Sequence, residues 1–170
     1  MGTSFGYNRQ ELDADYLTAT ELIHLFVDVV ARGGNLLINV GPTATGEIPW
    51  AQAQRLLELG RWLRLNHGAI YGTRRWERPQ GVTDEGLPIR YTASEDAVHA
   101  IVLGTPATTS VEIDVRLAEG AEVRLEGRRG SLPWSASPAG VRVELPEAPD
   151  IQPALSVRLA PAAAVHNLRE

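Results

Sequence analysis

The hydrophobic pattern of the chain changes its period near residue 80, and this change limits the folds that the chain can adopt. Before that point, apolar residues recur three or four positions apart in segments that glycine closes, which is typical of helices. After it, short runs of alternating apolar and polar residues are separated by glycine and proline, which is typical of antiparallel strands. We therefore expect two parts of different architecture, joined by a linker at 76–86, where Pro79, Gly81 and Gly86 gather.

The first part predicts a helix, a buried strand and a second helix. Thr18 and Glu21 have the spacing of a capping box, so a helix is expected to begin there and to end at the two glycines before residue 35. The run 35–40 is nearly all apolar and too short for a helix, which favours a strand that is buried on both faces. Pro49 is suited to the first turn of the second helix, whose expected inward residues are Leu56, Leu59, Trp62 and Leu63. This order indicates a parallel α/β unit, of which a barrel is one form.

The second part predicts a small antiparallel β-sandwich over residues 87–165. Val111, Ile113 and Val115 alternate with charged residues, as a sheet with one solvated face requires. Glycine and proline separate such runs at the spacing of a sandwich. The expected strands are 97–103, 110–115, 121–126, 141–145 and 155–159.

The composition excludes several classes of function. The chain has no cysteine, so disulfides, cysteine zinc sites and thiol nucleophiles are absent. The net charge is −5 and basic residues form no stripe, so we expect no nucleic-acid partner. Apolar runs are too short to cross a bilayer, so no membrane partner is expected, and no targeting signal indicates a compartment. No metal and no cofactor are expected, because the histidines lack metal-ligand spacing; they are His24, His67, His99 and His166.

Short strings in the first part resemble those of the α-L-fucosidases of glycoside hydrolase family 29, in the same order. The strings lie at 4–9, 33–42, 46–49, 59–63 and 69–73 and read SFGYNR, GGNLLINVGP, GEIP, LGRWL and AIYGT. The later β-rich part is similar to the C-terminal sandwich of that family. The resemblance implies that residues 1–75 are the last two βα elements of a (β/α)8 TIM barrel, the catalytic domain, and that 87–165 form the sandwich domain.

The resemblance also implies a function: a retaining α-L-fucosidase that hydrolyses terminal α-L-fucose from glycoconjugates by double displacement. Members of the family carry the nucleophilic aspartate and the acid/base carboxylate upstream of the string that begins here at Ser4. We therefore assign no catalytic residue to this chain and expect it to be inactive alone. We hypothesise that Met1 is an internal methionine taken as a start, which DNA upstream encoding nothing fucosidase-like would contradict.

The acidic residues of the chain do not suggest a catalytic pair. Retaining glycosidases need two carboxyl groups about 5 to 5.5 Å apart. Glu21 is explained as a helix cap, and Asp13 and Asp15 are expected as solvated turn residues. Asp28 is on the polar side of its helix and is expected at the surface.

Phe5 is the one residue that the resemblance assigns to substrate binding. It matches the aromatic residue that packs on the methyl group and apolar face of fucose in the family, a contact that an aromatic ring makes well. The alternative is a core aromatic of a barrel loop. Tyr7 and Asn8 are expected to form a turn, and Asn39 is expected to bond loop backbone.

The tryptophans are expected in core or interface positions rather than in a sugar-stacking platform. Trp62 fits a helix face and Trp76 fits a contact between the two parts, whereas Trp134 lies in a sandwich turn and Trp50 follows Pro49.

Two other functions remain open. One is a carbohydrate-binding or interaction module. The other is a fragment that complements a separately encoded N-terminal half of the barrel, because a barrel strand at 35–40 would lack neighbours and leave backbone groups unpaired. In this setting the barrel part either docks on the sandwich or self-associates.

Overall fold

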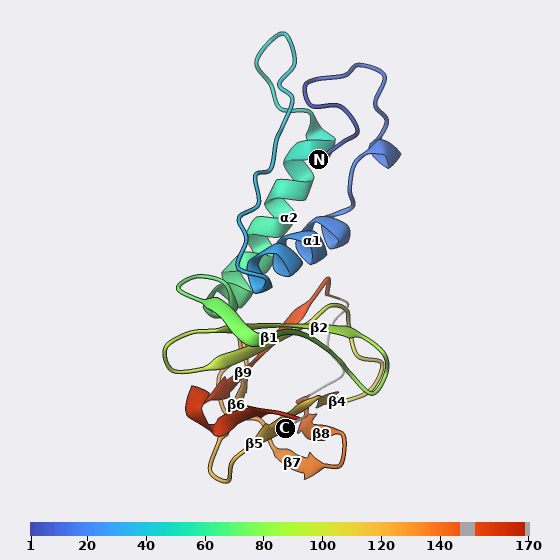
Figure 1. Ribbon diagram of the computed structural model, residues 1–170. Helices are drawn as coiled ribbons and strands as arrows, with labels where there is room; N and C mark the ends of the chain where they lie inside the picture. The colour runs from blue at the N-terminus through green and yellow to red at the C-terminus, as the bar shows by residue number, and fades with distance from the viewer. Residues whose placement is uncertain (147–151, 169–170) are drawn as a thin grey trace.

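The computed structural model describes residues 1–146 and 152–168. Two helices form one end of the molecule and antiparallel strands form the other, with the N-terminal loops farthest from the strands (Figure 1). This arrangement confirms the expected order of a part with two helices followed by an all-β part. Within the described residues, no helix is long and apolar enough to span a membrane.

The first helix, α1 (Ala19–Ala31), begins at the predicted capping box. The Thr18 hydroxyl accepts a hydrogen bond of 3.1 Å from the Glu21 amide, and the Glu21 carboxylate accepts one of 2.8 Å from the Thr18 amide. Gly33 follows the helix with a φ of 80°, a value that favours glycine. The short 3-10 helix η1 (Asp13–Asp15) precedes α1.

The second helix, α2 (Trp50–Asn66), begins directly after Pro49 and continues into the 3-10 helix η2 (His67–Ala69). Its residues Leu59 and Trp62 are buried, as the apolar spacing predicted. Between α1 and α2 the chain has no regular secondary structure. It runs from the end of α1 near the strands to a loop at the opposite end of the molecule, where α2 begins (Figure 1).

The strand expected at 35–40 does not form, so this prediction is wrong for the chain as folded. Leu37 exposes 91% of its surface, and Asn35 is also exposed. A strand that is buried on both faces needs a hydrogen-bonded neighbour on each side. The described residues place no strand beside this segment, so its backbone has no neighbour to pair with, although Ile38 packs against the helices.

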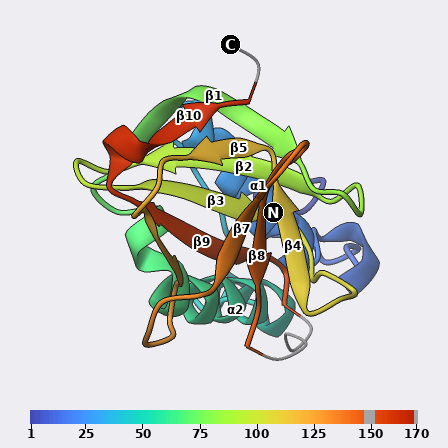
Figure 2. The ribbon, with the colours of Figure 1, turned by 90° about the horizontal axis from the view of Figure 1, so that it is seen from below.

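The β part consists of three antiparallel sheets. The largest has the order β1-β2-β3-β9-β6 and contains β1 (Arg74–Val82), β2 (Pro88–Ala93), β3 (Val98–Val102), β9 (Leu155–Ala160) and β6 (Glu122–Leu125). The second contains β4 (Ser110–Ile113), β8 (Gly140–Glu144) and β7 (Trp134–Ser137), and the third pairs β5 (Val115–Leu117) with β10 (Val165–Asn167), after the 3-10 helix η3 (Ala162–Ala164). Figure 2 shows β7 and β8 in front of the largest sheet and α2 behind it.

The expected strands are present, with two differences. The run 110–115 is split at Asp114 into β4 and β5. Residues 76–82 of the expected linker belong to β1. Proline and glycine in this segment suggested a break, but the pairing of β1 with β2 shifts register between Arg75 and Gln80, and such an irregularity accommodates Pro79 within a strand. Gly81 follows the irregularity and pairs with Ile89.

The molecule has two apolar clusters that meet at the largest sheet. One fills the sandwich between its sheets and includes Trp76, whose ring centre lies 5.0 Å from that of Tyr91. Trp76 is therefore part of the sandwich core, rather than of a contact between the two parts as expected. The other cluster joins α1 and α2 to Ile101 and Leu103 of the sandwich part. The helices thus dock on the outer face of the largest sheet.

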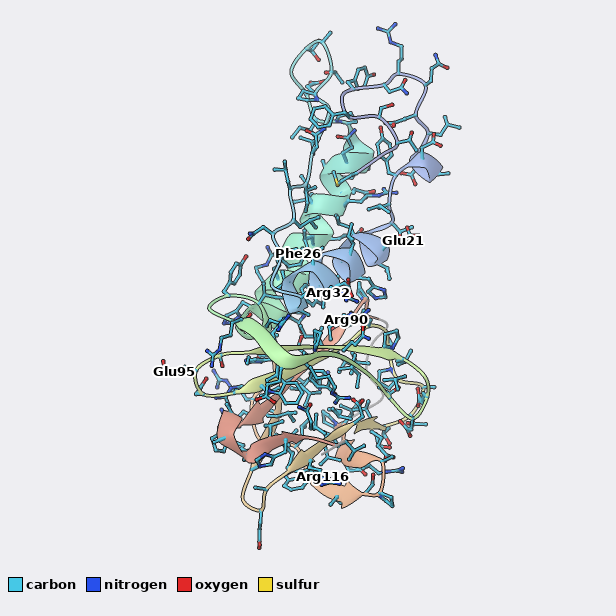
Figure 3. The ribbon with its side chains drawn as sticks, in the orientation of Figure 1. Glu21, Phe26, Arg32, Arg90, Glu95 and Arg116 are labelled. Carbon is cyan, nitrogen blue, oxygen red and sulfur yellow. The ribbon has the colours of Figure 1, made fainter. Side chains whose placement is uncertain are left out.

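Polar contacts reinforce this junction. The Thr92 hydroxyl of β2 donates a hydrogen bond of 2.7 Å to the carbonyl of Ala69. Asp28, expected as a surface residue, is half-buried and forms ion pairs with Arg32, at 2.8 Å, and with Arg90 of β2. The expectation that Asp28 lies at the surface was wrong, because the polar side of α1 faces the sheet at this position. Figure 3 shows Arg32 and Arg90 close together there.

Candidate functional site

The candidate site is the loop that carries Phe5, at the end of the molecule away from the sandwich (Figure 1). Phe5 exposes 85% of its surface and Tyr7 43%. In this chain Phe5 is therefore no core aromatic. Its ring is available for contact with another molecule or another part of a barrel, and its role in substrate binding stays a prediction.

Side chains within the loop fix the backbone that precedes and follows Phe5. The Glu11 carboxylate accepts hydrogen bonds from the Ser4 amide, at 2.7 Å, and from the Thr3 hydroxyl, at 3.0 Å. Asn8 accepts one from the Gln10 amide at 3.0 Å and donates one to the Ser4 hydroxyl at 2.9 Å. Asn8 thus has the turn role that the sequence predicted.

The segment 39–41 supports the loop from the other side. The side-chain amide of Asn39 donates a hydrogen bond to the carbonyl of Phe5, which confirms that Asn39 bonds loop backbone. Gly41 lies against the same loop, since a Cβ at this position would be 2.4 Å from the Tyr7 nitrogen. The amide of Gly41 donates a hydrogen bond to Gln52 of α2 at 2.9 Å. Glu11, Gly41 and Gln52 were not predicted as parts of the site.

The signal for Gln52 is visible in the sequence. Gln52 precedes the expected inward residues Leu56, Leu59 and Leu63 at helical spacing, so it is a polar residue at the start of an apolar stripe. A polar residue that is buried in this way needs a hydrogen-bond partner.

Each carboxylate near the loop is held by a structural partner. Asp13 forms an ion pair with Arg55 at 2.9 Å, and Asp15 accepts a hydrogen bond of 2.7 Å from the Leu12 amide. Hydrogen bonds from Ser4 and from Thr18, respectively, lower the pKa of Glu11 and of Glu21 below its ordinary value. A general acid near neutral pH needs a raised pKa, so these lowered values suit structural acceptors and not proton donors.

Two hollows formed by the described residues do not have Phe5 in their lining. A shallow hollow of about 450 Å³ lies beside the loop and is lined by residues 1–3, 14–17 and Glu21. A more enclosed cavity of about 220 Å³ lies at the junction with the sandwich, between Asn66 of α2 and Ser156 of β9. The described residues also contain no group of three or more histidine, aspartate or glutamate side chains that could hold a metal.

The tryptophans are placed differently from one another. Trp62 and Trp76 are buried, and Trp134 is half-buried, with its indole nitrogen donating to the carbonyl of Ala121 at 3.0 Å. Trp50 exposes 69% of its surface, so it is no core residue in this chain, and an interface position stays a prediction. In 1–146 and 152–168, the strongly exposed aromatic residues all precede β1 and are Phe5, Tyr7, Trp50 and Tyr71.

Comparisons with known proteins agree on one family. The family model for α-L-fucosidase matches residues 1–68. An α-L-fucosidase of Branchiostoma floridae is 36% identical over 147 residues, which are 85% of this chain and 32% of that protein. The plasma α-L-fucosidase of Homo sapiens is 35% identical over 85% of this chain and 32% of its own length.

Solved structures give the same result. The crystal structure of Thermotoga maritima α-fucosidase in complex with fucose superposes with a TM-score of 0.85 at 38% identity, covering 94% of this chain and 38% of that one. The match thus extends over both the helices and the sandwich. The chain spans about a third of the length of the curated relatives that it matches.

Proposed function

Because this chain belongs to the α-L-fucosidase family and has the fold of its C-terminal region, we propose that it forms part of a retaining α-L-fucosidase that hydrolyses terminal α-L-fucose from glycoconjugates. The observation that carries the proposal is the superposition with an enzyme that was solved in complex with fucose, at 38% identity over 94% of the chain. The substrate is then a fucosylated glycan.

We propose the same division of labour between the two parts as the motifs suggested. Residues 1–75 form the end of the catalytic barrel, and residues 87–165 form the sandwich that supports it. The helices dock on the sandwich through one continuous apolar cluster, which supports a fixed orientation between the parts. β1 begins at Arg74, so this strand continues directly from the end of the barrel part into the sandwich.

The chain alone is proposed to be inactive. A double displacement needs a nucleophile and a second carboxyl group that donates a proton. The carboxylates near Phe5 are each bound by a structural partner, as described above, and the pKa values of Glu11 and Glu21 are lowered, which does not suit a proton donor. The role of Phe5 is to contact the apolar face and methyl group of fucose.

The partner of this chain is proposed to be the remaining barrel elements, on the same polypeptide or on a second one. Large apolar side chains at Leu12, Leu37 and Trp50 are exposed in the helical part, and exposed apolar surface of this kind marks an interaction site. Packing of barrel strands on both sides of 35–40 would pair its backbone and cover these side chains.

A separately encoded half would be detected by mixing. The barrel elements of a relative that precede its Phe-Gly-Tyr-Asn string are expressed as a separate chain and added to this one. Hydrolysis of an aryl α-L-fucoside by the mixture, and by neither chain alone, would support complementation. A carbohydrate-binding module is less well supported, since the sandwich presents no exposed aromatic residue in its described part.

A further inference from the structure

We propose that the buried Gln52 is a positioning residue that holds the Phe5-bearing segment 4–8 through the backbone of Gly41. The inference deepens the proposed function and rests on it where it concerns fucose binding. It concerns a residue that makes no contact with Phe5 itself and acts through two intermediate contacts.

The first contact is the side-chain amide of Gln52 at the start of α2. Gln52 exposes 3% of its surface, and its Oε1 accepts the Gly41 amide hydrogen bond at 2.9 Å, while its Nε2 donates to the Tyr16 hydroxyl at 3.3 Å. Both ends of the amide are therefore used, which fixes its orientation. An apolar side chain here would leave the buried Gly41 N–H without its partner.

The second contact joins Gly41 to the loop. Any Cβ at position 41 would lie 2.4 Å from the nitrogen of Tyr7 and 2.6 Å from the carbonyl carbon of Gly6, so the two backbones touch directly. Asn39, two residues earlier, donates its hydrogen bond to the Phe5 carbonyl. The segment 39–41 thus contacts the backbone of the loop from the Phe5 carbonyl to Tyr7, directly after the Phe5 side chain.

The Phe5 ring has no packing of its own that could replace this support. It is almost fully exposed, so its direction follows from the backbone at 5–7. A loop that is fixed before substrate arrives binds with a smaller loss of conformational entropy. Loss of the Gln52 hydrogen bonds is therefore expected to weaken substrate binding more than the chemical step.

The first test measures amide hydrogen exchange in the 170-residue chain, without any need for activity. We expect Gln52→Leu to accelerate exchange about tenfold at the two hydrogen-bonded amides of the loop, those of Ser4 and Glu11, while amides of the sandwich and of α1 keep their protection. Gln52→Glu keeps an oxygen that accepts from Gly41 and should stay within about twofold of the parent chain. Gln54→Leu is the matched control, because the Gln54 side chain makes no hydrogen bond within the described residues, and it should also change exchange less than about twofold.

A second, milder variant tests the proposal even if Gln52→Leu does not fold. Tyr16→Phe removes the hydroxyl that accepts from Gln52 and should accelerate exchange at the Ser4 and Glu11 amides by a smaller factor than Gln52→Leu. Unchanged exchange at the Ser4 and Glu11 amides in both Gln52→Leu and Tyr16→Phe would overturn the proposal.

The second test uses the chain extended upstream through the barrel. There, Gln52→Leu should raise KM for an aryl α-L-fucoside about tenfold with kcat changed less than about threefold, and Gln52→Glu should restore most of the difference. A fall in kcat of about tenfold with an unchanged KM would contradict a positioning role. An inactive extended parent would overturn the proposed function, whereas the exchange result would still decide whether Gln52 positions the loop.

Discussion

The indole nitrogen of Trp62 donates a hydrogen bond of 2.8 Å to the carbonyl oxygen of Ala154, which joins α2 to the segment before β9. The preceding carbonyl, of Pro153, bonds the imidazole of His24 on α1 at 2.6 Å. Two neighbouring carbonyls of the sandwich part therefore receive one side chain from each helix. This arrangement orients the helical part on the sandwich more specifically than apolar packing does alone.

Replacing Trp62 with phenylalanine should destabilise the chain. Trp62→Phe leaves the Ala154 carbonyl unpaired in a buried position, and the expected cost is about 1 to 3 kcal/mol. Urea denaturation followed by circular dichroism measures this difference. Trp50→Phe, at an exposed position, is the control and should stay within about 0.5 kcal/mol of the parent chain. Equal stability of the two variants would contradict the role given to Trp62.

The ion pairs of Asp28 should make stability depend on pH. Burial raises the pKa of Asp28, but hydrogen bonds from Arg32 and Arg90 outweigh it and hold the pKa below 3.8. The stabilisation is therefore present above the ordinary value and is lost as the pH falls through the lower value of the folded chain. We expect Asp28→Asn to be less stable than the parent at pH 7 and equally stable near about pH 2.

The control for this prediction is Asp13→Asn. Asp13 pairs with Arg55, but its side chain is 73% exposed, so the pair should contribute little at any pH. A destabilisation by Asp28→Asn that persists unchanged at low pH would show that the ion pairs are not its cause.

Within the sandwich, removing the carboxylate of Asp114 should reduce stability more than removing an exposed carboxylate with an equally short ion pair. Asp114 accepts hydrogen bonds of 2.5 Å from Arg78 and from the Tyr91 hydroxyl, and burial together with this carboxylate raises the pKa of Tyr91 well above its ordinary value. Asp114→Ala leaves both donors unpaired, and we expect a loss of about 2 to 4 kcal/mol. Asp96→Ala removes a 2.5 Å pair with Arg158 at an exposed position and should destabilise the chain much less than Asp114→Ala. Thermal unfolding of the two variants side by side decides the ranking.

The exposed apolar residues of the helical part should drive association of the isolated chain. Leu37→Gln removes the most exposed of them, and we expect a smaller sedimentation coefficient at high protein concentration without loss of stability. Val82→Thr changes an exposed apolar residue of the sandwich and should leave sedimentation unchanged. Association that is equal in the parent chain and in Leu37→Gln would show that this surface is not the contact.

Local signals in the sequence predicted most of the fold. The capping box at Thr18, the proline before α2 and the alternation at 111–115 act within a few residues, so the structure confirms the elements that they predicted. The strand at 35–40 failed for the opposite reason. Its apolar pattern is typical of a buried strand, but a strand is buried only where neighbouring strands pair with it. The described residues place no strand beside this segment.

The candidate site was predicted only where its contacts are local or where a residue type implied them. The turn at Asn8 follows from a contact two residues away, and the bond of Asn39 to loop backbone follows from an amide at the end of an apolar run. The role of Gln52 depends on partners 11 and 36 residues away, which no local pattern can specify.

The measurement that tests the central claim most directly is fluorimetric hydrolysis of an aryl α-L-fucoside. The 170-residue chain is compared with a chain that is extended upstream through the remaining barrel elements. We predict turnover by the extended chain and none by the short one. Turnover by the short chain, abolished by replacing one of its own acids such as Asp13 or Asp15, would contradict the account, because the catalytic pair would then lie within these residues.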